Sequence, residues 1–292
     1  MKFYQAMCNL KVQINKKINM KNCDGDIVIS CPIKNDNEYL MEFTEHYLNL
    51  GFDKIYFYDN NDDDAINPKD VLKSYIITNK VEIINYRNVP FRDKWHRYNF
   101  LTNYNFSWVL FVDDDEFLEL KKHKNIKEFL SSFNSDVTKI AINNLHYGDN
   151  EKCYYEKGNV QDRFKVPLAL DSGTENFTFN SAIKSLLRKT NSFIQINAHS
   201  LKDDNPYYNA DNKKVLLREY WNINDADVTY DTAYIKHYNT KSLEEFVKCK
   251  MKRAKGDNES VRRFNIDTYY FLYNIRTKEK ENLIEYFINK YL

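Results

Sequence analysis

Four short apolar segments, each followed by polar residues, set the pattern of the first half of the chain. They span residues 27–31, 54–58, 81–86 and 108–112 and are rich in β-branched and aromatic residues, as buried strands are. Between them, a segment ending at Leu50 and residues 68–78 and 93–103 have the features of helices. Asn35 or Asp36 could cap the first helix, and Gly51 suits the left-handed position after its end. This alternation predicts an α/β fold with a mostly parallel sheet covered by helices on both faces.

The second half alternates less regularly. Strands are predicted at residues 139–143, 185–188, 192–196 and 232–235, and the loop over 148–175 is polar. A helix is predicted from Ser242 to about Lys255, because Ser242 and Glu245 have the spacing of a capping box, and residues 268–292 are also expected to be helical. We therefore expect four parts: an N-terminal extension, two halves of one domain and a helical C-terminal segment, at residues 1–25, 26–120, 121–240 and 241–292.

Composition narrows the possible classes of protein. The chain has 292 residues, of which 42% are hydrophobic and 15% aromatic, so it can bury a core and is neither disordered nor collagen-like. Its formal net charge of +1 does not favour nucleic acid as a partner. The five cysteines are scattered, which predicts reduced thiols. Neither a membrane span nor a signal peptide is visible, so we expect a soluble, cytoplasmic protein.

The most informative motif is Asp113-Asp114-Asp115-Glu116, directly after the fourth apolar segment. Ligands of open α/β sheets bind beyond the carboxyl ends of the strands, and this motif is expected there. Asp113 and Asp115 can face the same side and could bind a hard cation such as Mn²⁺ or Mg²⁺. The alternative is a solvated acidic turn, which is the favoured interpretation for residues 62–64.

The chain resembles glycosyltransferases of the GT-A fold, of family 2 type and in particular the subgroup related to family 92. The resemblance covers about residues 26–256 and is carried by residues 30–35, 42–47, 56–60, 113–117, 184–188, 198–200 and 237–242. It implies a GT-A (Rossmann-like) mixed sheet and a nucleotide-sugar donor, usually a uridine diphosphate (UDP) sugar, held through Mn²⁺ or Mg²⁺. A glycan or a glycosylated protein would be the acceptor.

The resemblance also implies roles for individual residues. Asp115 would bind the metal, and Asp113 would serve the ribose or the water shell of the metal. A late histidine, His237 before His199, would complete the metal shell. Contacts with the nucleotide sugar are expected from Pro32, Ile33, Lys34, Asn35, Asp59, Arg87 and Asp114. Independently of the resemblance, Lys241 begins a locally basic stretch that either reaches the donor diphosphate or is a solvated face. Lys94 stands where relatives often have glutamine, so the contacts of the nucleotide pocket are expected to differ there.

The general base and the acceptor site stay open. An inverting enzyme needs a carboxylate base, and the candidates in the second half are Asp171, Glu175, Asp203 and Asp204. The tyrosine pairs at 154–155, 207–208 and 269–270 could line an acceptor groove or the contact of a homo-oligomer. Two other functions are alternatives: a metal-dependent phosphohydrolase, and a carbohydrate-binding protein that kept the fold without turnover. Phosphatases with an aspartyl nucleophile favour Thr or Val where this chain has Glu116-Phe117 after the aspartates.

Overall fold

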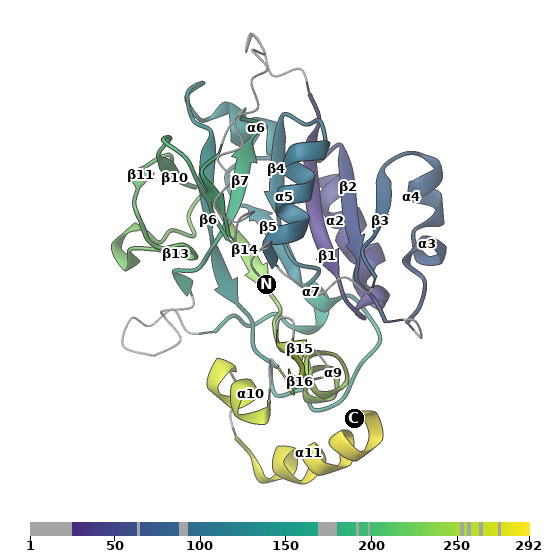
Figure 1. The fold of residues 1–292 in the computed structure, drawn as a ribbon. Helices are drawn as coiled ribbons and strands as arrows, with labels where there is room; N and C mark the ends of the chain where they lie inside the picture. The colour runs from purple at the N-terminus through teal and green to yellow at the C-terminus, as the bar shows by residue number, and fades with distance from the viewer. Residues whose placement is uncertain are drawn as a thin grey trace.

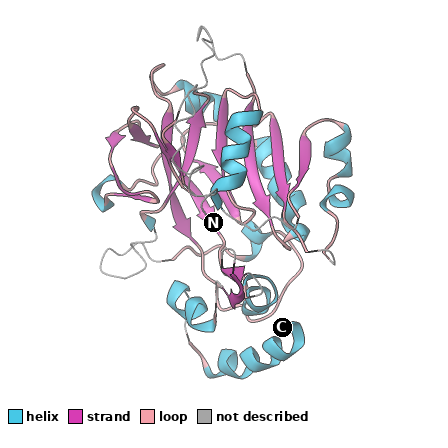
Figure 2. Cartoon of the chain, in the orientation of Figure 1, coloured by secondary structure: helices cyan, strands magenta, loops and turns pink. Residues whose placement is uncertain are grey.

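One large sheet forms the body of the protein, and the C-terminal helices lie beyond one of its edges (Figures 1 and 2). The computed structural model describes residues 25–62, 65–87, 93–168, 180–190, 193–197, 199–251, 254–255, 258–262, 265–273 and 276–292. The order of the strands in the main sheet is β11-β10-β6-β7-β4-β1-β2-β3. The mixed, mostly parallel sheet flanked by helices that the sequence predicts is confirmed.

The first half of the sheet is parallel. Its strands are β1 (Ile27–Ile33), β2 (Lys54–Asp59), β3 (Val81–Asn85) and β4 (Trp108–Phe111). Successive side chains of a strand point to opposite faces, and β1 follows this rule. Ile27, Ile29 and Cys31 join one core cluster, whereas Val28 joins the other.

Helices cover both faces because each face of the sheet is apolar. α2 (Leu40–Asn49) and α6 (Ile126–Ser131) pack on the face of Ile29 through residues such as Phe43 and Phe129. α5 (Asp93–Asn103) lies on the opposite face, where Phe100 packs against Phe111 (Figure 1). The remaining helical elements before the C-terminal segment are short: η1 (Asn37–Tyr39), α3 (Pro68–Val71), α4 (Lys73–Ile77), α7 (Val160–Arg163) and η2 (Asp225–Asp227).

The second half of the sheet changes strand direction. β7 (Ile183–Arg188) runs antiparallel to both β4 and β6 (Lys139–His146), so β6 again runs parallel to the first four strands. β14 (Ala233–His237) pairs with β6 in parallel and with β5 (Glu116–Leu120) antiparallel. The shorter strands of this half are β8 (Gln195–Ile196), β9 (Leu201–Lys202), β10 (Tyr207–Asn209), β11 (Lys214–Val215), β12 (Leu217–Glu219) and β13 (Asn222–Ile223). Of the strand expected at 192–196, only the part in β8 is seen, and residue 192 lies outside the described residues.

Three local expectations need correction. β1 continues through Pro32 to Ile33, because its pairing with β4 ends at Ser30 and the missing N–H of proline therefore costs no ladder bond on that side. Asp36 precedes η1 but makes no side-chain capping hydrogen bond, since its carboxylate binds Lys241 instead. Gly51, by contrast, has the predicted left-handed conformation, with a φ of 89°.

The third correction concerns the helix after Ser242. The capping box with Glu245 is present, but the regular helix α9 (Leu243–Glu245) passes at once into η3 (Phe246–Lys250), a π-helical turn. Instead of continuing to Lys255, the chain forms the hairpin of β15 (Ala254–Lys255) and β16 (Asn258–Arg262).

The C-terminal segment is helical, as predicted, with α10 (Ile266–Tyr273) and α11 (Lys278–Tyr291). Phe246, Tyr269 and Phe287 share one apolar cluster that joins these helices to α9 and η3. Buried Asp149, in the loop after β6, accepts hydrogen bonds from Tyr269 and from Lys280. These contacts attach the end of the chain beside the loop that follows β6.

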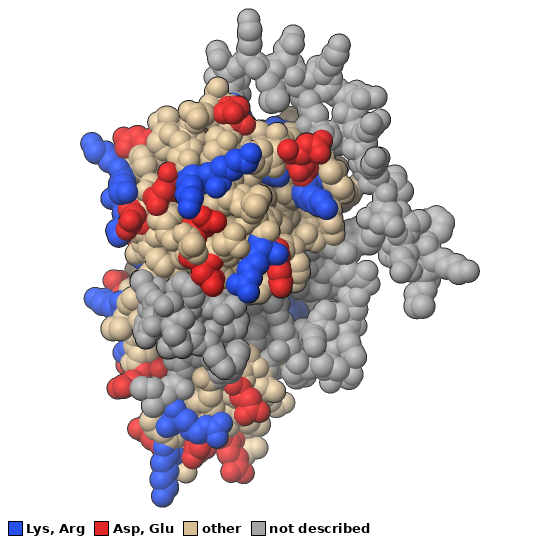
Figure 3. All heavy atoms as spheres, turned by 90° about the vertical axis from the view of Figure 1, so that its left-hand side faces the viewer, with Lys and Arg blue, Asp and Glu red and all other residues tan. Residues whose placement is uncertain are grey.

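The surface and the helices agree with the composition. On the face shown in Figure 3, basic and acidic side chains are interspersed rather than gathered into one patch of a single sign. No helix in the described part of the chain combines the length and the apolar character needed to cross a membrane. Cys31, Cys153 and Cys249 are free thiols, in line with the expected reduced state.

The turn after α2 generates a stability prediction. A left-handed backbone is strained for alanine but is tolerated better by asparagine. We expect Gly51→Ala to lower the free energy of unfolding by about 1 kcal/mol, and Gly51→Asn to lower it by less. Urea denaturation of the two variants and the wild type measures this difference. Equal midpoints for wild type and Gly51→Ala would contradict the strain argument.

Candidate active site

The acidic motif joins β4 to β5 at the carboxyl edge of the sheet and is largely buried. Asp115 and Glu116 are 1% and 0% exposed, and Asp114 is buried with them, whereas the Asp113 side chain is 42% exposed. The backbone N–H of Asp113 donates to Glu116 Oε2 at 2.8 Å, which closes the turn. The motif is therefore not a solvated acidic loop.

Two buried lysines from distant parts of the chain neutralise these carboxylates. Lys184, in β7, has its Nζ 2.7 Å from Asp113 Oδ2 and 2.8 Å from Glu116 Oε2. Lys250, the last residue of η3, contacts Asp115 Oδ2 directly. Buried charges are unfavourable unless they are paired. The lysines therefore supply counter-charge to the acidic motif from within the protein.

Because of these partners and of burial, the carboxyl groups of the motif differ in pKa. Burial favours the neutral form of Asp115, but Lys250, His237 and Lys241 outweigh it and hold its pKa below the ordinary value. Burial likewise opposes the charge on Asp113, and Lys184 overcomes it, so the pKa of Asp113 is also lowered. For Glu116, burial and the neighbouring aspartates prevail over Lys184 and raise its pKa to about 8. Two ionised aspartates therefore stand beside a glutamic acid that is neutral at pH 7.

His237 lies next to the aspartates, as predicted. Its Nε2 is 3.6 Å from Asp115 Oδ1, and its Nδ1 is 3.5 Å from Glu116 Oε1. Burial, opposed by Asp115, lowers the pKa of His237 to about 4, so the imidazole is neutral and can act as a metal ligand. His146, at the end of β6, packs against it with ring centroids 4.7 Å apart. His199 instead has its Nδ1 3.0 Å from the carbonyl oxygen of Ile183.

The residues expected to bind the nucleotide form a second polar cluster at the ends of β1, β2 and β3. Asp59 Oδ2 accepts from Arg87 Nε at 3.0 Å, and Asp62 contacts both Lys34 and Asn35. A pocket of about 280 Å³ lies beside this cluster, lined by Asp59, Ala65, Asn67, Lys69, Ile83, Asn85 and Arg87.

Two other predicted nucleotide contacts are buried. Pro32 lies within β1, and the side chain of Ile33 packs into the hydrophobic core. Lys94 belongs to α5, but its side chain lies outside the described residues.

Lys241 connects the carboxylate cluster to the C-terminal segment. Its Nζ is 3.1 Å from Asp36 Oδ2 and lies over the Tyr39 ring, 4.5 Å from the centroid. Burial opposes its charge, but Asp36, Asp115 and Asp114 raise the pKa of Lys241 above its ordinary value. Its backbone φ of 54° is rare for a lysine and indicates that the surrounding contacts hold it in place.

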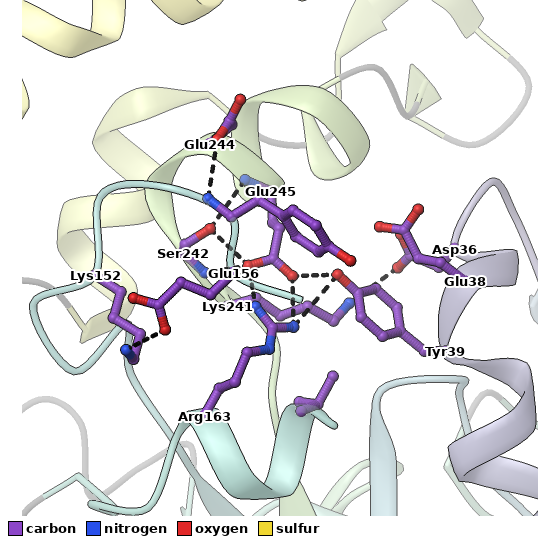
Figure 4. Close-up of polar contacts among 12 residues, drawn as sticks. Asp36, Glu38, Tyr39, Lys152, Glu156, Arg163, Lys241, Ser242, Glu244 and Glu245 are labelled. Carbon is purple, nitrogen blue, oxygen red and sulfur yellow. Dashed lines mark hydrogen bonds and ion pairs between the residues drawn. The ribbon is translucent and has the colours of Figure 1, made fainter. Parts of the chain in front are cut away.

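A buried ion-pair network follows directly on Lys241 (Figure 4). Glu245 accepts two hydrogen bonds of 2.9 Å from the Arg163 guanidinium and another from Tyr39. The same carboxylate completes the capping box with Ser242. Such bidentate, fully partnered pairs are geometrically specific. The network therefore sets where α9 and η3 begin relative to the carboxyl edge.

Of the candidate bases, the two that the structure describes, Asp203 and Asp204, are not brought to this site. Asp203 Oδ1 is 2.6 Å from Lys139 Nζ, at the start of β6, and Asp204 beside it is exposed. The start of β6 lies at the edge of the sheet opposite the motif, level with Val109 and roughly 13 Å from Asp113 along the strand direction at 3.3 Å per residue. Asp171 and Glu175 lie outside the described residues.

Sequence reasoning missed Lys184, Lys250 and His146 as site residues. His146 could have been found, because it follows an apolar strand just as His237 does. Lys184 is a lone charge in the apolar stretch Ala182-Ile183-Lys184-Ser185-Leu186, which is a weaker signal. No local pattern distinguished Lys250 as a site residue, because several other lysines lie nearby in the sequence.

Asp115 and His237 are the two side chains that could bind a divalent cation, although Lys250 contacts the same Asp115 carboxylate. Within the described ranges, no three His, Cys, Asp or Glu side chains are arranged to hold one metal ion. Asp115 Oδ1 and His237 Nε2, 3.6 Å apart, can both be reached by an ion that sits about 2.1 Å from each. Mg²⁺ and similar ions commonly bind through one or two side chains and take water and substrate phosphates for the remaining positions.

The mixed α/β sheet, with buried aspartates after the fourth strand at the edge where open sheets bind ligands, is the architecture expected of a GT-A-like fold. The sequence model of glycosyltransferase family 92 matches residues 28–274. The chain therefore belongs to glycosyltransferase family 92, which confirms the resemblance seen in the sequence. None of the curated protein sequences matches it.

Solved structures with a similar fold are distant. The chain is 17% identical to S. aureus TarS, covering 56% of this chain and 28% of TarS with a TM-score of 0.34. TarS 1–349 in complex with UDP-GlcNAc is 17% identical, with 56% and 45% covered and a TM-score of 0.35. The mannosyltransferase PcManGT from Pyrobaculum calidifontis, in complex with GDP-Man and Mn²⁺, is 10% identical, with 42% and 39% covered and a TM-score of 0.31. The chain spans less than half the length of each, and these scores carry no inference about its ligands.

Glu116 generates a prediction about pH. Its pKa is raised to about 8 in the folded protein, whereas an unfolded glutamate ionises near its ordinary value of 4.5. Between these values only the folded state holds the proton, so this group lowers stability as the pH rises. We expect Glu116→Gln to remove that loss, so that its stability relative to wild type increases by about 1 kcal/mol per pH unit from pH 5 to 8. Urea denaturation across this range measures the effect, and parallel curves for the two proteins would mean that Glu116 is ionised in the folded state.

Proposed function

We propose that this protein is a metal-dependent glycosyltransferase that moves a sugar from a nucleotide-sugar donor, first of all a UDP-sugar, to a hydroxyl group of a glycan or glycosylated protein. The observation that carries the proposal is the buried motif at residues 113–116 with its lysine partners, at the carboxyl edge of a family 92 fold. A purely structural acidic turn would not be expected to bury aspartates beside a neutral imidazole.

The chemistry requires positive charge where the donor breaks. The bond from the anomeric carbon to the diphosphate oxygen breaks, its electron pair leaves with the diphosphate, and the acceptor oxygen forms the new bond as its proton passes to a base. Lys184, Lys241 and Lys250 surround the aspartates and are suited to stabilise the developing negative charge. When bound, Mn²⁺ or Mg²⁺ would add Lewis-acid stabilisation of the same leaving group. Asp115 and His237 would hold it, and the more exposed Asp113 is suited to the ribose or to the water shell of the ion.

The polar cluster of Lys34, Asn35, Asp59 and Arg87 is suited to the nucleoside. It offers carboxylate, amide and cationic groups beside the pocket at the ends of β2 and β3. Donors and acceptors in fixed positions are what a base and a ribose need for recognition. In this proposal, Pro32 and Ile33 contribute only backbone atoms to the nucleotide site. Asp114 lines the site. The general base, the acceptor groove and a homo-oligomer stay predictions.

The test is donor turnover with and without metal. The protein is incubated with several nucleotide sugars, with a lysate or glycan acceptor, in Mn²⁺ or in a chelator, and release of the nucleoside diphosphate is measured. Metal-dependent UDP release supports the proposal. Release of inorganic phosphate alone would favour the phosphohydrolase, and ligand binding without turnover across donors and acceptors would favour the carbohydrate-binding protein.

Substitution of Asp115 tests the metal assignment directly. We expect Asp115→Asn to reduce metal-dependent UDP release by about 100-fold or more, because a metal ligand of this kind supplies several kcal/mol of transition-state stabilisation. UDP with Mn²⁺ should raise the melting temperature of the wild type by mass action and leave that of Asp115→Asn unchanged. Asp231→Asn, an exposed aspartate before β14, is the matched control and should behave as wild type. Full activity in Asp115→Asn would overturn the metal assignment.

A further inference from the structure

Lys250 occupies the carboxylate that the proposed function assigns to a metal ion. Its side chain is 6% exposed and that of Asp115 is 1% exposed, and the two are in direct contact. The remaining oxygen, Oδ1, faces His237 Nε2 at 3.6 Å. Asp115 is therefore paired with a cation that the protein itself supplies.

A divalent cation and the Lys250 ammonium compete for the same carboxylate. Both are positive, both gain from contact with Asp115, and like charges a few ångströms apart in a buried site repel strongly. Lys184 is not a second partner for Asp115, because its ammonium already contacts Asp113 and Glu116. A metal ion bound at Asp115 and His237 is therefore incompatible with Lys250 in its present position.

The position of Lys250 in the chain allows its charged end to move. It is the last residue of η3, and π-helical turns are frequently found at functional sites. The start of the turn is anchored, since Phe246 and Val247 are buried in the C-terminal cluster and the capping box of Ser242 precedes them. A lysine has a flexible four-carbon side chain, so the ammonium can leave Asp115 without unfolding this anchor.

We propose that Lys250 is the resident cation of the donor-free site and that a divalent cation displaces it from Asp115 when the donor binds. This inference rests on the proposed function. Asp115 stays paired at every stage, and metal without donor binds weakly because it must first remove a cation. The released ammonium then lies next to the incoming diphosphate, so metal and nucleotide bind cooperatively.

The experiment compares Mn²⁺ binding by two neighbouring lysine variants in the full chain. Lys250→Met removes the competing charge and should bind Mn²⁺ alone at least about tenfold more tightly than wild type, measured by calorimetry or by the electron paramagnetic resonance signal of free Mn²⁺. Lys248→Met is the matched control on the same turn. Lys248 is 43% exposed and is 3.5 Å from Glu38, so its loss should leave Mn²⁺ affinity unchanged. Addition of UDP should tighten Mn²⁺ binding more in the wild type than in Lys250→Met.

A second variant covers the case in which Lys250→Met does not fold. Lys250→Gln keeps a hydrogen-bond donor for Asp115 but removes the charge, so it should fold and also bind Mn²⁺ more tightly than wild type. In both variants Mn²⁺ should raise the melting temperature more than it does in the wild type, because the ion replaces the missing cation.

The outcomes separate this inference from the proposed function. If the wild type binds Mn²⁺ with UDP, but Lys250→Gln and Lys250→Met bind Mn²⁺ alone no more tightly than Lys248→Met, displacement of Lys250 is wrong and the metal site stands. If no protein in the set binds Mn²⁺ even with UDP, both the metal assignment and the displacement are wrong.

Discussion

The pairing of buried carboxylates with lysines from distant parts of the chain is the constraint on which the rest of this structure depends. Asp113 and Lys184 are 71 residues apart, and Asp115 and Lys250 are 135 residues apart. A buried charge such as that of Asp115 would cost several kcal/mol if it were left unpaired. The sheet and the C-terminal segment must therefore reach their final arrangement together for the acidic motif to be buried at all.

The change of strand direction in the sheet makes this pairing possible. Because β7 runs antiparallel to β4, its first residues lie at the edge where β4 ends, which puts Lys184 beside Asp113. β6 and β14 run the other way and finish at the same edge, so they bring His146 and His237 together there. A sheet with only parallel strands would place the start of each strand, and any lysine there, at the far edge.

The C-terminal segment is part of the site rather than an appendage. The Glu245 network with Arg163 and Tyr39 fixes where α9 starts (Figure 4). From there, η3 carries Lys250 to Asp115. On the other side, Asp149 holds Lys280 of α11. Any movement of Lys250 takes place against this anchored background, so the change at Asp115 can be confined to one side chain.

Local sequence patterns determined the elements, and only the tertiary structure decided which charges meet. The parallel strands, α5, the left-handed Gly51 and the Ser242 capping box follow from residues close together in the chain, because periodicity and capping are short-range effects. The acidic motif and its edge of the sheet could be predicted for the same reason. The partners of that motif could not be predicted. The ion pair between Lys250 and Asp115 depends on strand order, on strand direction and on the point where α9 passes into the π-helical turn η3. Asp36 and Asp203 are further examples. Each is an ordinary polar residue in the sequence, and each forms an ion pair with a lysine that only the fold brings near.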